Sequence, residues 1–193
     1  LHVLTHSFPT RRSSDLFLLV IDNFRYDQWR VLAEGLADSF DIDERLYMSI
    51  LPTATQYARN AIFSGLMPME IQQMFPDLWV DEDEDNGKNV HEEALIAGLL
   101  ARYRRRESFS YHKINDSQSM ERLLTHFNEL QHNDFNVLVV NFIDMLSHAR
   151  TESRMVRELA NNESAYRSIT QSWLRHSGMS ELFRVLSHVD CHV

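Results

Sequence analysis

Threonine residues that could attack a phosphoryl group follow an apolar segment of this chain. The segment Ile50-Leu51-Pro52-Thr53-Ala54-Thr55 breaks an apolar run at a proline and leads into a predicted helix that Gly65 ends. A hydroxyl at the start of a helix lies beside free backbone N–H groups and the positive end of the helix dipole. Thr55 is therefore a candidate nucleophile for attack on phosphorus, and Thr53 is the alternative. The same pattern also fits an ordinary threonine N-cap.

Two carboxylates and an imidazole follow other apolar segments. Asp22 comes directly after the run 17–21, and Asp144 follows the run 135–143, with His148 four residues further on. Carboxylate and imidazole ligands suit zinc, and a pair at positions i and i+4 can meet one ion where the backbone is helical. The alternative is that each aspartate is a helix N-cap and that the histidine is exposed.

The elements that must position these residues alternate between strands and helices. The patterns predict strands at 17–21, 45–51, 109–114 and 135–143, with a further strand starting at Val189. They predict helices at 25–40, 54–64, 69–75, 89–106 and 116–132, capped by Asp116 or Ser117, and a helical region at 152–186 broken near Asn161-Asn162 and Gly178. This alternation indicates an α/β fold with a mainly parallel sheet, in which ligands gather at the carboxyl ends of the strands.

The composition limits the classes of partner. The formal net charge of −9 argues against an extended nucleic-acid surface, and no apolar run is long enough to span a membrane. The one cysteine, Cys191, excludes a disulfide framework and fits a reducing compartment. We therefore expect a cytoplasmic protein of one domain, or part of a larger one.

The first sixteen residues differ from the rest. His6-Ser7-Phe8-Pro9-Thr10-Arg11-Arg12-Ser13-Ser14-Asp15-Leu16 resembles a translated sequencing adapter. We expect residues 1–16 to be non-native and residues 17–193 to hold the domain. The alternative is a natural polar N-terminus without a role in the fold.

Two other clusters invite a metal-site interpretation. The acidic run 81–87 suggests calcium, but it lacks the glycine and terminal glutamate of an EF-hand loop, so a solvated surface is the preferred interpretation. The closing residues His188, Asp190, Cys191 and His192 could bind zinc, since alternation along a strand sends three of them to one face, but we interpret them as strand-edge residues.

Two stretches carry a family resemblance. Residues 20–29, Val-Ile-Asp-Asn-Phe-Arg-Tyr-Asp-Gln-Trp, and residues 51–60, Leu-Pro-Thr-Ala-Thr-Gln-Tyr-Ala-Arg-Asn, are similar to the PglZ domain, a branch of the alkaline phosphatase superfamily. The chain resembles most the form that follows a receiver domain in response regulators of the PorX type. The resemblance covers essentially all of residues 17–193, and it implies an alkaline-phosphatase-like α/β/α sandwich with a mainly parallel sheet.

The resemblance also implies a phosphohydrolase site with two divalent metals, usually zinc. By position, Asp22 would bind one metal together with Thr55, the nucleophile, and a phosphothreonine intermediate would form. Asp144 and His148 would bind the second metal. Two metals can brace the entering and leaving oxygens of a phosphoryl transfer.

Three further residues are implied as donors to phosphoryl oxygens: Asn23, Arg59 and Asn60. Related phosphodiesterases have an asparagine three residues after the nucleophile, where this chain has Ala58. The family also has a Thr-Asp-His-Gly-type motif after the next strand, which completes the metal site, and the sequence contains no such motif. We therefore expect a domain that is incomplete at its C-terminus and inactive as a fragment.

The leading hypothesis is a metal-dependent phosphodiesterase or phosphatase effector domain of a bacterial two-component response regulator. Its substrate would be a phosphate ester, with a nucleotide as one option, and signalling proteins would be its partners. The alternative is a non-catalytic PglZ module that binds protein partners. A receiver-like phosphoacceptor would use Asp22 at a strand end, but it fails on chain length and on the missing acidic pair and lysine.

Overall fold

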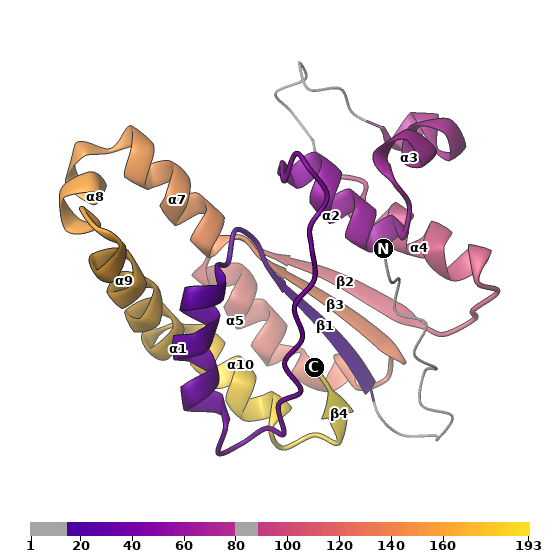
Figure 1. Ribbon diagram of the computed structural model, residues 1–193. Coiled ribbons are helices and arrows are strands. Elements are labelled where there is room, and N and C mark those ends of the chain that lie inside the picture. Colours follow the sequence, from indigo (N-terminus) through magenta and orange to yellow (C-terminus); the bar gives the residue numbers. More distant parts are fainter. Residues whose placement is uncertain (1–14, 80–88) are drawn as a thin grey trace. The chain divides into compact units, whose positions relative to one another are not determined.

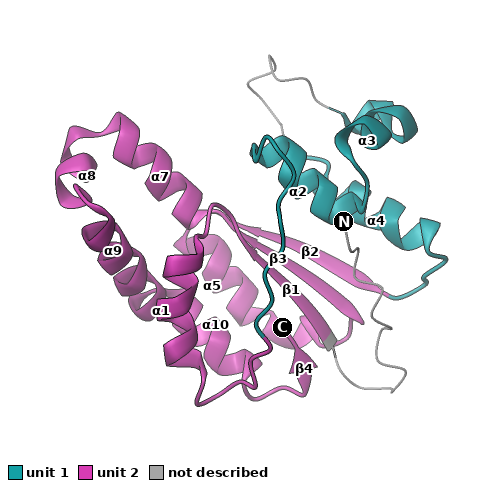
Figure 2. Cartoon of the chain, in the orientation of Figure 1, with its two compact units in different colours: residues 1–8, 44–107 teal, residues 9–43, 108–193 magenta. Residues whose placement is uncertain are grey.

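The structure, a computed structural model, describes residues 15–79 and 89–193, which form two compact units (Figures 1 and 2). The described residues of unit 1 are 44–79 and 89–107, and the described residues of unit 2 are 15–43 and 108–193. The chain of unit 2 is thus interrupted by unit 1. The acidic run 81–87 and most of the segment 1–16 lie outside the described residues.

Unit 2 is built on a parallel sheet. Its described strands are β1 (Asp15–Ile21), β2 (Phe109–Ile114), β3 (Phe135–Val140) and β4 (Cys191–His192), in the order β2-β3-β1-β4. All three strand pairs are parallel, so the predicted α/β class and parallel sheet are confirmed. The first strand starts two residues before its predicted boundary at 17, because Asp15 and Leu16 pair with β4. These two residues therefore belong to the sheet.

Helices follow the strands of unit 2. They are α1 (Tyr26–Leu36), α5 (Ser117–Thr125), α6 (Phe127–Leu130), α7 (Phe142–Glu152), α8 (Arg154–Leu159), α9 (Glu163–His176) and α10 (Gly178–Leu186). The predicted breaks near Asn161-Asn162 and Gly178 are confirmed, since Asn162 caps α9 and Ser177 caps α10. Asp116 caps α5, as predicted, by accepting a hydrogen bond from the Ser119 N–H at 2.7 Å.

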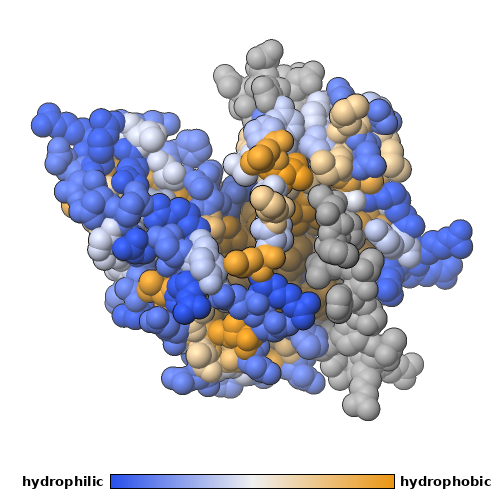
Figure 3. Space-filling view, in the orientation of Figure 1, coloured by the Kyte–Doolittle hydropathy of each residue, from blue (hydrophilic) through white to orange (hydrophobic). Residues whose placement is uncertain are grey.

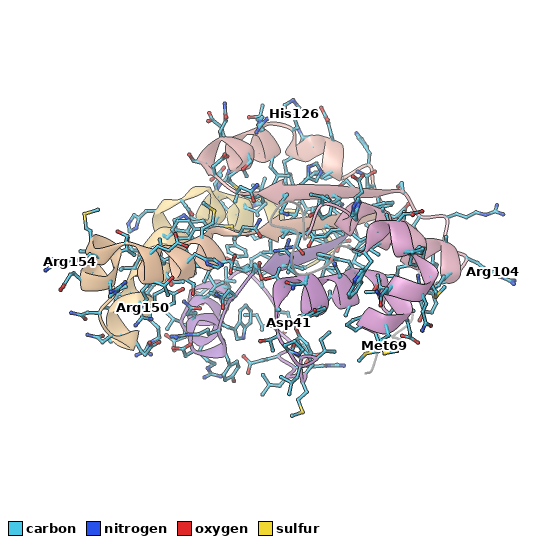
Figure 4. All side chains as sticks on the ribbon, turned by 90° about the horizontal axis from the view of Figure 1, so that it is seen from above. Asp41, Met69, Arg104, His126, Arg150 and Arg154 are labelled. Atoms are coloured by element: carbon cyan, nitrogen blue, oxygen red, sulfur yellow. The ribbon has the colours of Figure 1, made fainter. Side chains whose placement is uncertain are left out.

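The core of unit 2 lies against one face of its sheet. Apolar side chains that alternate along the strands, such as Phe17 of β1 and Leu138 of β3, pack with Met120 of α5, Phe127 of α6 and Leu182 of α10. Figure 4 shows α5 and α6, joined at His126, on this side of the sheet. All six residues of β3, the polar Asn136 among them, are buried, as is typical of a strand inside a parallel sheet.

Unit 1 is helical in its described residues. It contains α2 (Thr55–Ser64), α3 (Pro68–Met74), the 3-10 turn η1 (Pro76–Leu78) and α4 (Glu92–Arg102). Gly65 ends α2 with a φ of 63°, the left-handed conformation that glycine adopts without strain. The prediction that this glycine closes the helix is confirmed. Among the described residues, no helix is both long and apolar enough to cross a bilayer.

Two strand predictions were wrong, and the helix predicted at 116–132 is divided at His126 into α5 and α6. Residues 45–51 form no strand, and Leu46, Tyr47, Met48 and Leu51 are largely exposed in an irregular segment. Leucine, tyrosine and isoleucine in this segment suggest a strand, but a strand needs a partner to form its hydrogen bonds. The strand predicted at 135–143 stops at Val140, and α7 begins at Phe142. Asp144 favours this helix because it lies in the first turn.

Candidate functional site

Asp22 and Asn23 form the turn that leaves β1. The Asp22 N–H donates to the Val140 carbonyl at 2.9 Å, which extends the pairing of β1 with β3 by one residue. Asn23 has a φ of 56°, a left-handed conformation that asparagine tolerates better than most residues. Its N–H donates to Asp22 Oδ1 at 3.0 Å. These bonds hold the turn at the carboxyl edge of the sheet.

Asp144 and His148 lie one helical turn apart on α7. The backbone there is helical, which is the condition under which residues four apart can share an ion. Asp144 Oδ2 lies 3.6 Å from His148 Nε2. The Asp144 side chain is 26% exposed and that of His148 is 68% exposed, so the pair is open on the histidine side.

Polar residues from neighbouring strand ends meet at this edge of unit 2. The Asn23 side-chain amide donates a long hydrogen bond, 3.5 Å, to Asp144 Oδ1, which joins the ends of β1 and β3. The Asn141 amide donates to Asn115 Oδ1 at 2.6 Å, which joins the ends of β3 and β2. Unit 2 therefore brings together Asn23, Asp144 and His148, and Asp22 adjoins them through the turn.

Thr55 belongs to unit 1, where it is the first residue of α2. The N-cap of α2 is Ala54, and no side chain caps the helix. The alternative interpretation, in which Thr53 or Thr55 is an ordinary N-cap of this helix, is therefore wrong. Thr55 is half-buried and Thr53 is exposed. In the first turn of α2, the Tyr57 N–H donates to the carbonyl of the N-cap residue Ala54 at 3.0 Å.

Arg59 and Asn60, the other two candidates in unit 1, are buried in the middle of α2. Arg59 Nε donates to Glu92 Oε1 at 2.7 Å, and Nη2 donates to Glu92 Oε2 at 2.9 Å. This two-point pairing commits much of the donor capacity of Arg59 to the buried carboxylate of α4. Asn60 Oδ1 is buried without a hydrogen-bond partner. Sequence reasoning missed Glu92, because nothing in its neighbourhood marks it as a buried partner of α2.

The donor set at the edge of unit 2 has the chemistry of a zinc site but not its full number of ligands. Two ligand atoms bound to a tetrahedral zinc at about 2.1 Å lie about 3.4 Å apart, which is close to the 3.6 Å between the Asp144 and His148 donors. Within residues 15–79 and 89–193, however, no group of three His, Cys, Asp or Glu side chains is arranged to hold a metal ion. The Asp144–His148 pair therefore fits part of a metal site.

The closing histidine and cysteine cluster makes local contacts. His188 Nδ1 lies 2.6 Å from the Arg184 carbonyl, and Cys191 Sγ lies 3.7 Å from the Leu186 carbonyl. Cys191 and His192 form β4, and Cys191 packs against the core of unit 2. These residues extend the sheet beside β1.

The comparison with known families gives one match. The family described as the BREX system PglZ alkaline phosphatase-like domain matches residues 5–189, which is nearly the whole chain and includes both units. No curated protein matches the chain. The parallel sheet with helices after its strands agrees with an alkaline-phosphatase-like α/β fold. The chain therefore belongs to the PglZ alkaline phosphatase-like domain family.

Proposed function

We propose that this domain is a metal-dependent phosphoesterase in which Thr55 is the nucleophile and Asp22, Asp144 and His148 bind divalent metals. Alkaline-phosphatase-like families in general use such metals on phosphate esters. The observation that carries the proposal is the position of the Asp144 carboxylate, 3.5 Å from the Asn23 amide and 3.6 Å from the His148 imidazole. Three chemically suitable side chains thus meet at the ends of β1 and β3.

We propose zinc as the metal, and two ions in the complete site. Carboxylate and imidazole ligands suit zinc, and the separation of the Asp144 and His148 donors agrees with two ligands of one ion. The additional ligands would come from the Thr-Asp-His-Gly-type motif of the family, which this sequence lacks. The experiments below therefore use the protein in the form that carries this motif, which we call the full-length protein.

The proposed reaction forms and breaks a bond to Thr55. Bound zinc would lower the pKa of the threonine hydroxyl and withdraw charge from the phosphoryl oxygens. Thr55 Oγ1 attacks phosphorus, its proton leaves to solvent, and the leaving-group oxygen departs and takes up a proton. A monoester thus yields phosphothreonine, and a diester yields a threonine ester that keeps the second substituent. Water then attacks phosphorus and restores the Thr55 hydroxyl.

Asn23, Arg59 and Asn60 are the proposed donors to phosphoryl oxygens. Asn23 is exposed and carries a side-chain amide next to Asp144, so it is the donor to test first. Arg59 would need to keep its pairing with Glu92 while it bound an anion, or exchange that pairing for substrate. Asn60 has amide donor capacity and a buried oxygen without a partner.

The wider role follows from the resemblance to PorX-type response regulators. We propose a cytoplasmic effector domain in bacterial two-component signalling, with signalling proteins as partners and a nucleotide-type phosphate ester as substrate class. The single cysteine is compatible with a reducing compartment.

The test is hydrolysis of a chromogenic phosphodiester by the full-length protein with zinc. We expect Thr55→Ala to reduce the rate by at least about 1,000-fold, because the nucleophile is lost, while Thr53→Ala serves as the matched control and keeps most of the rate. Unchanged hydrolysis by Thr55→Ala would reject the assignment of the nucleophile. No hydrolysis by any variant, with partner binding intact, would favour the non-catalytic module.

A further inference from the structure

A carboxylate on α9 links the two segments that carry the proposed metal ligands. Glu163 accepts a hydrogen bond from Arg25 Nη1 and another, of 3.1 Å, from Arg150 Nη1. Arg25 lies three residues after Asp22 and is the N-cap residue of α1. Arg150 lies two residues after His148 on α7 and is labelled in Figure 4. We call this arrangement the Glu163 bridge.

Tyr166, one turn further along α9, contacts both arginines of the Glu163 bridge. The Arg25 and Arg150 guanidinium carbons lie 5.2 Å and 5.1 Å from the centre of its ring, within the range of cation–π attraction. Its hydroxyl donates to the carbonyl of Ile143, the residue before Asp144, at 3.4 Å. Burial raises the pKa of Tyr166, so the hydroxyl remains a neutral donor. One buried ring therefore contacts both arginines and the start of α7.

A second carboxylate fixes Arg25 in place. Asp27 accepts from Arg25 Nε at 3.0 Å and Nη2 at 2.9 Å, and from Arg167 Nη1 at 3.0 Å. Buried Gln28 accepts from the Arg25 N–H at 2.9 Å and donates to Thr170 of α9 at 2.8 Å. The start of α1 is thus attached to α9 through its backbone and through the side chain of Arg25.

We expect the ion pairs of Glu163 to affect the positions of α1 and α7 more than the free energy of folding. The Glu163 side chain is 53% exposed, and Figure 3 shows that the visible surface of α7, α8 and α9 is mostly hydrophilic. Ion pairs exposed to this degree contribute little to the free energy of folding. The hydrogen bond from Arg25, and then that from Arg150, hold the pKa of Glu163 below its usual value, so the bridge stays charged.

We propose that Glu163 is a positioning residue that sets the separation between the turn carrying Asp22 and the helical turn carrying Asp144 and His148. The inference rests on the proposed function, because it assigns those residues to metal binding. Glu163→Gln leaves one acceptor oxygen where the carboxylate has two, so Arg25 and Arg150 can no longer both bond to this side chain. Arg25 stays bonded to Asp27, whereas Arg150 and α7 lose their ion pair. Because Glu163 bonds to two arginines and not to the proposed ligands themselves, we expect its loss to weaken zinc binding by no more than about 5-fold.

The test is the zinc affinity of the full-length protein, measured by competition with a chromophoric chelator. We expect Glu163→Gln to bind zinc about 3–5-fold more weakly and to change the visible spectrum of the cobalt-substituted protein. The matched control is Glu181→Gln, which removes the same charge from another exposed glutamate, paired with Arg184 on α10. The control should keep the affinity and the spectrum of the unchanged protein, and urea denaturation should show similar stability for both variants.

A second variant keeps the test decisive if Glu163→Gln does not fold. Arg150→Gln breaks the same bridge from the side of α7, and we expect a similar loss of zinc affinity. Affinity and spectrum equal to those of Glu181→Gln, in whichever bridge variant folds, would overturn the inference.

Asp144→Ala separates this failure from failure of the proposed function. If Asp144→Ala weakens zinc binding and the bridge variants do not, only the positioning role of Glu163 is rejected. If Asp144→Ala also leaves zinc binding unchanged, the metal assignment itself is rejected, and the positioning role with it.

Discussion

His148 offers the sharpest test of a single proposed ligand. Because its side chain is 68% exposed, truncation should change the stability of the fold by less than about 0.5 kcal/mol. We expect His148→Ala to weaken zinc binding by more than about 100-fold, since a lost ligand costs more than a lost supporting group. Isothermal titration of the full-length protein with zinc measures this change.

His176→Ala is the matched control for that titration. His176 is another exposed histidine of unit 2, on α9, and its Nδ1 lies 2.8 Å from the Ser172 carbonyl. We expect its loss to leave zinc affinity unchanged. Equal affinities for the two variants would mean that His148 is not a ligand.

At the residue scale, the sequence predicted local relationships and missed distant ones. The i, i+4 spacing of Asp144 and His148 correctly indicated two donors that approach each other, because a helix enforces that geometry. The Glu163 bridge has no such signal: Arg25 and Glu163 are separated by 138 residues in the chain. Only the packing of α1 and α7 beside α9 brings them together.

At the scale of elements, Asp134 connects the starts of β2 and β3. Its carboxylate accepts from the Ser108 hydroxyl at 2.8 Å and from the Ser108 N–H at 2.9 Å. These bonds, that from the side chain first, hold the pKa of Asp134 below its usual value. A carboxyl with a lowered folded-state pKa stabilises the fold above its unfolded pKa, near 3.9, and this contribution is lost as pH falls through the folded pKa.

We therefore expect Asp134→Asn to be less stable than the unchanged chain at pH 7, with a gap that narrows below about pH 4. Urea denaturation midpoints at pH 7 and pH 3 measure the gap. A gap of constant size across this range would show that ionisation of Asp134 does not stabilise the sheet.

The elements themselves were predictable where one local pattern dominated. Runs of mainly apolar residues indicated β1 and β3. Asn162 and Gly178 correctly marked the boundaries between the last helices. The segment 45–51 was misassigned because strand formation depends on a partner, which local composition does not reveal. The start of α7 was missed because Phe142 and Ile143 continue the apolar run of β3.

At the scale of the molecule, the core of unit 2 determines stability. Leu182 of α10 is fully buried among side chains from the sheet and from neighbouring helices. We expect Leu182→Ala to lower the free energy of unfolding by about 2–5 kcal/mol, through lost burial and the cavity left behind. Chemical denaturation measures this, with Met155→Ala on α8, where the methionine is 71% exposed, as a control that should change it by less than about 0.5 kcal/mol. Equal losses for both variants would contradict the assigned core.

The sequence indicated the fold class of the whole molecule but not its division into two units. Alternation of strands and helices predicts a parallel sheet, whereas the grouping of 44–107 apart from the residues before and after it depends on which helices pack together. The proposed nucleophile belongs to unit 1 and the proposed ligands Asp22, Asp144 and His148 belong to unit 2.

The most direct measurement of the central claim is identification of the residue that becomes covalently phosphorylated during turnover. Full-length protein with zinc would be mixed with a phosphate monoester, quenched in acid within a turnover, digested and sequenced by tandem mass spectrometry. The account predicts phosphothreonine at Thr55, and its absence from Thr55→Ala. Phosphate on another residue, or turnover with Thr55 unmodified at every quench time, would contradict it.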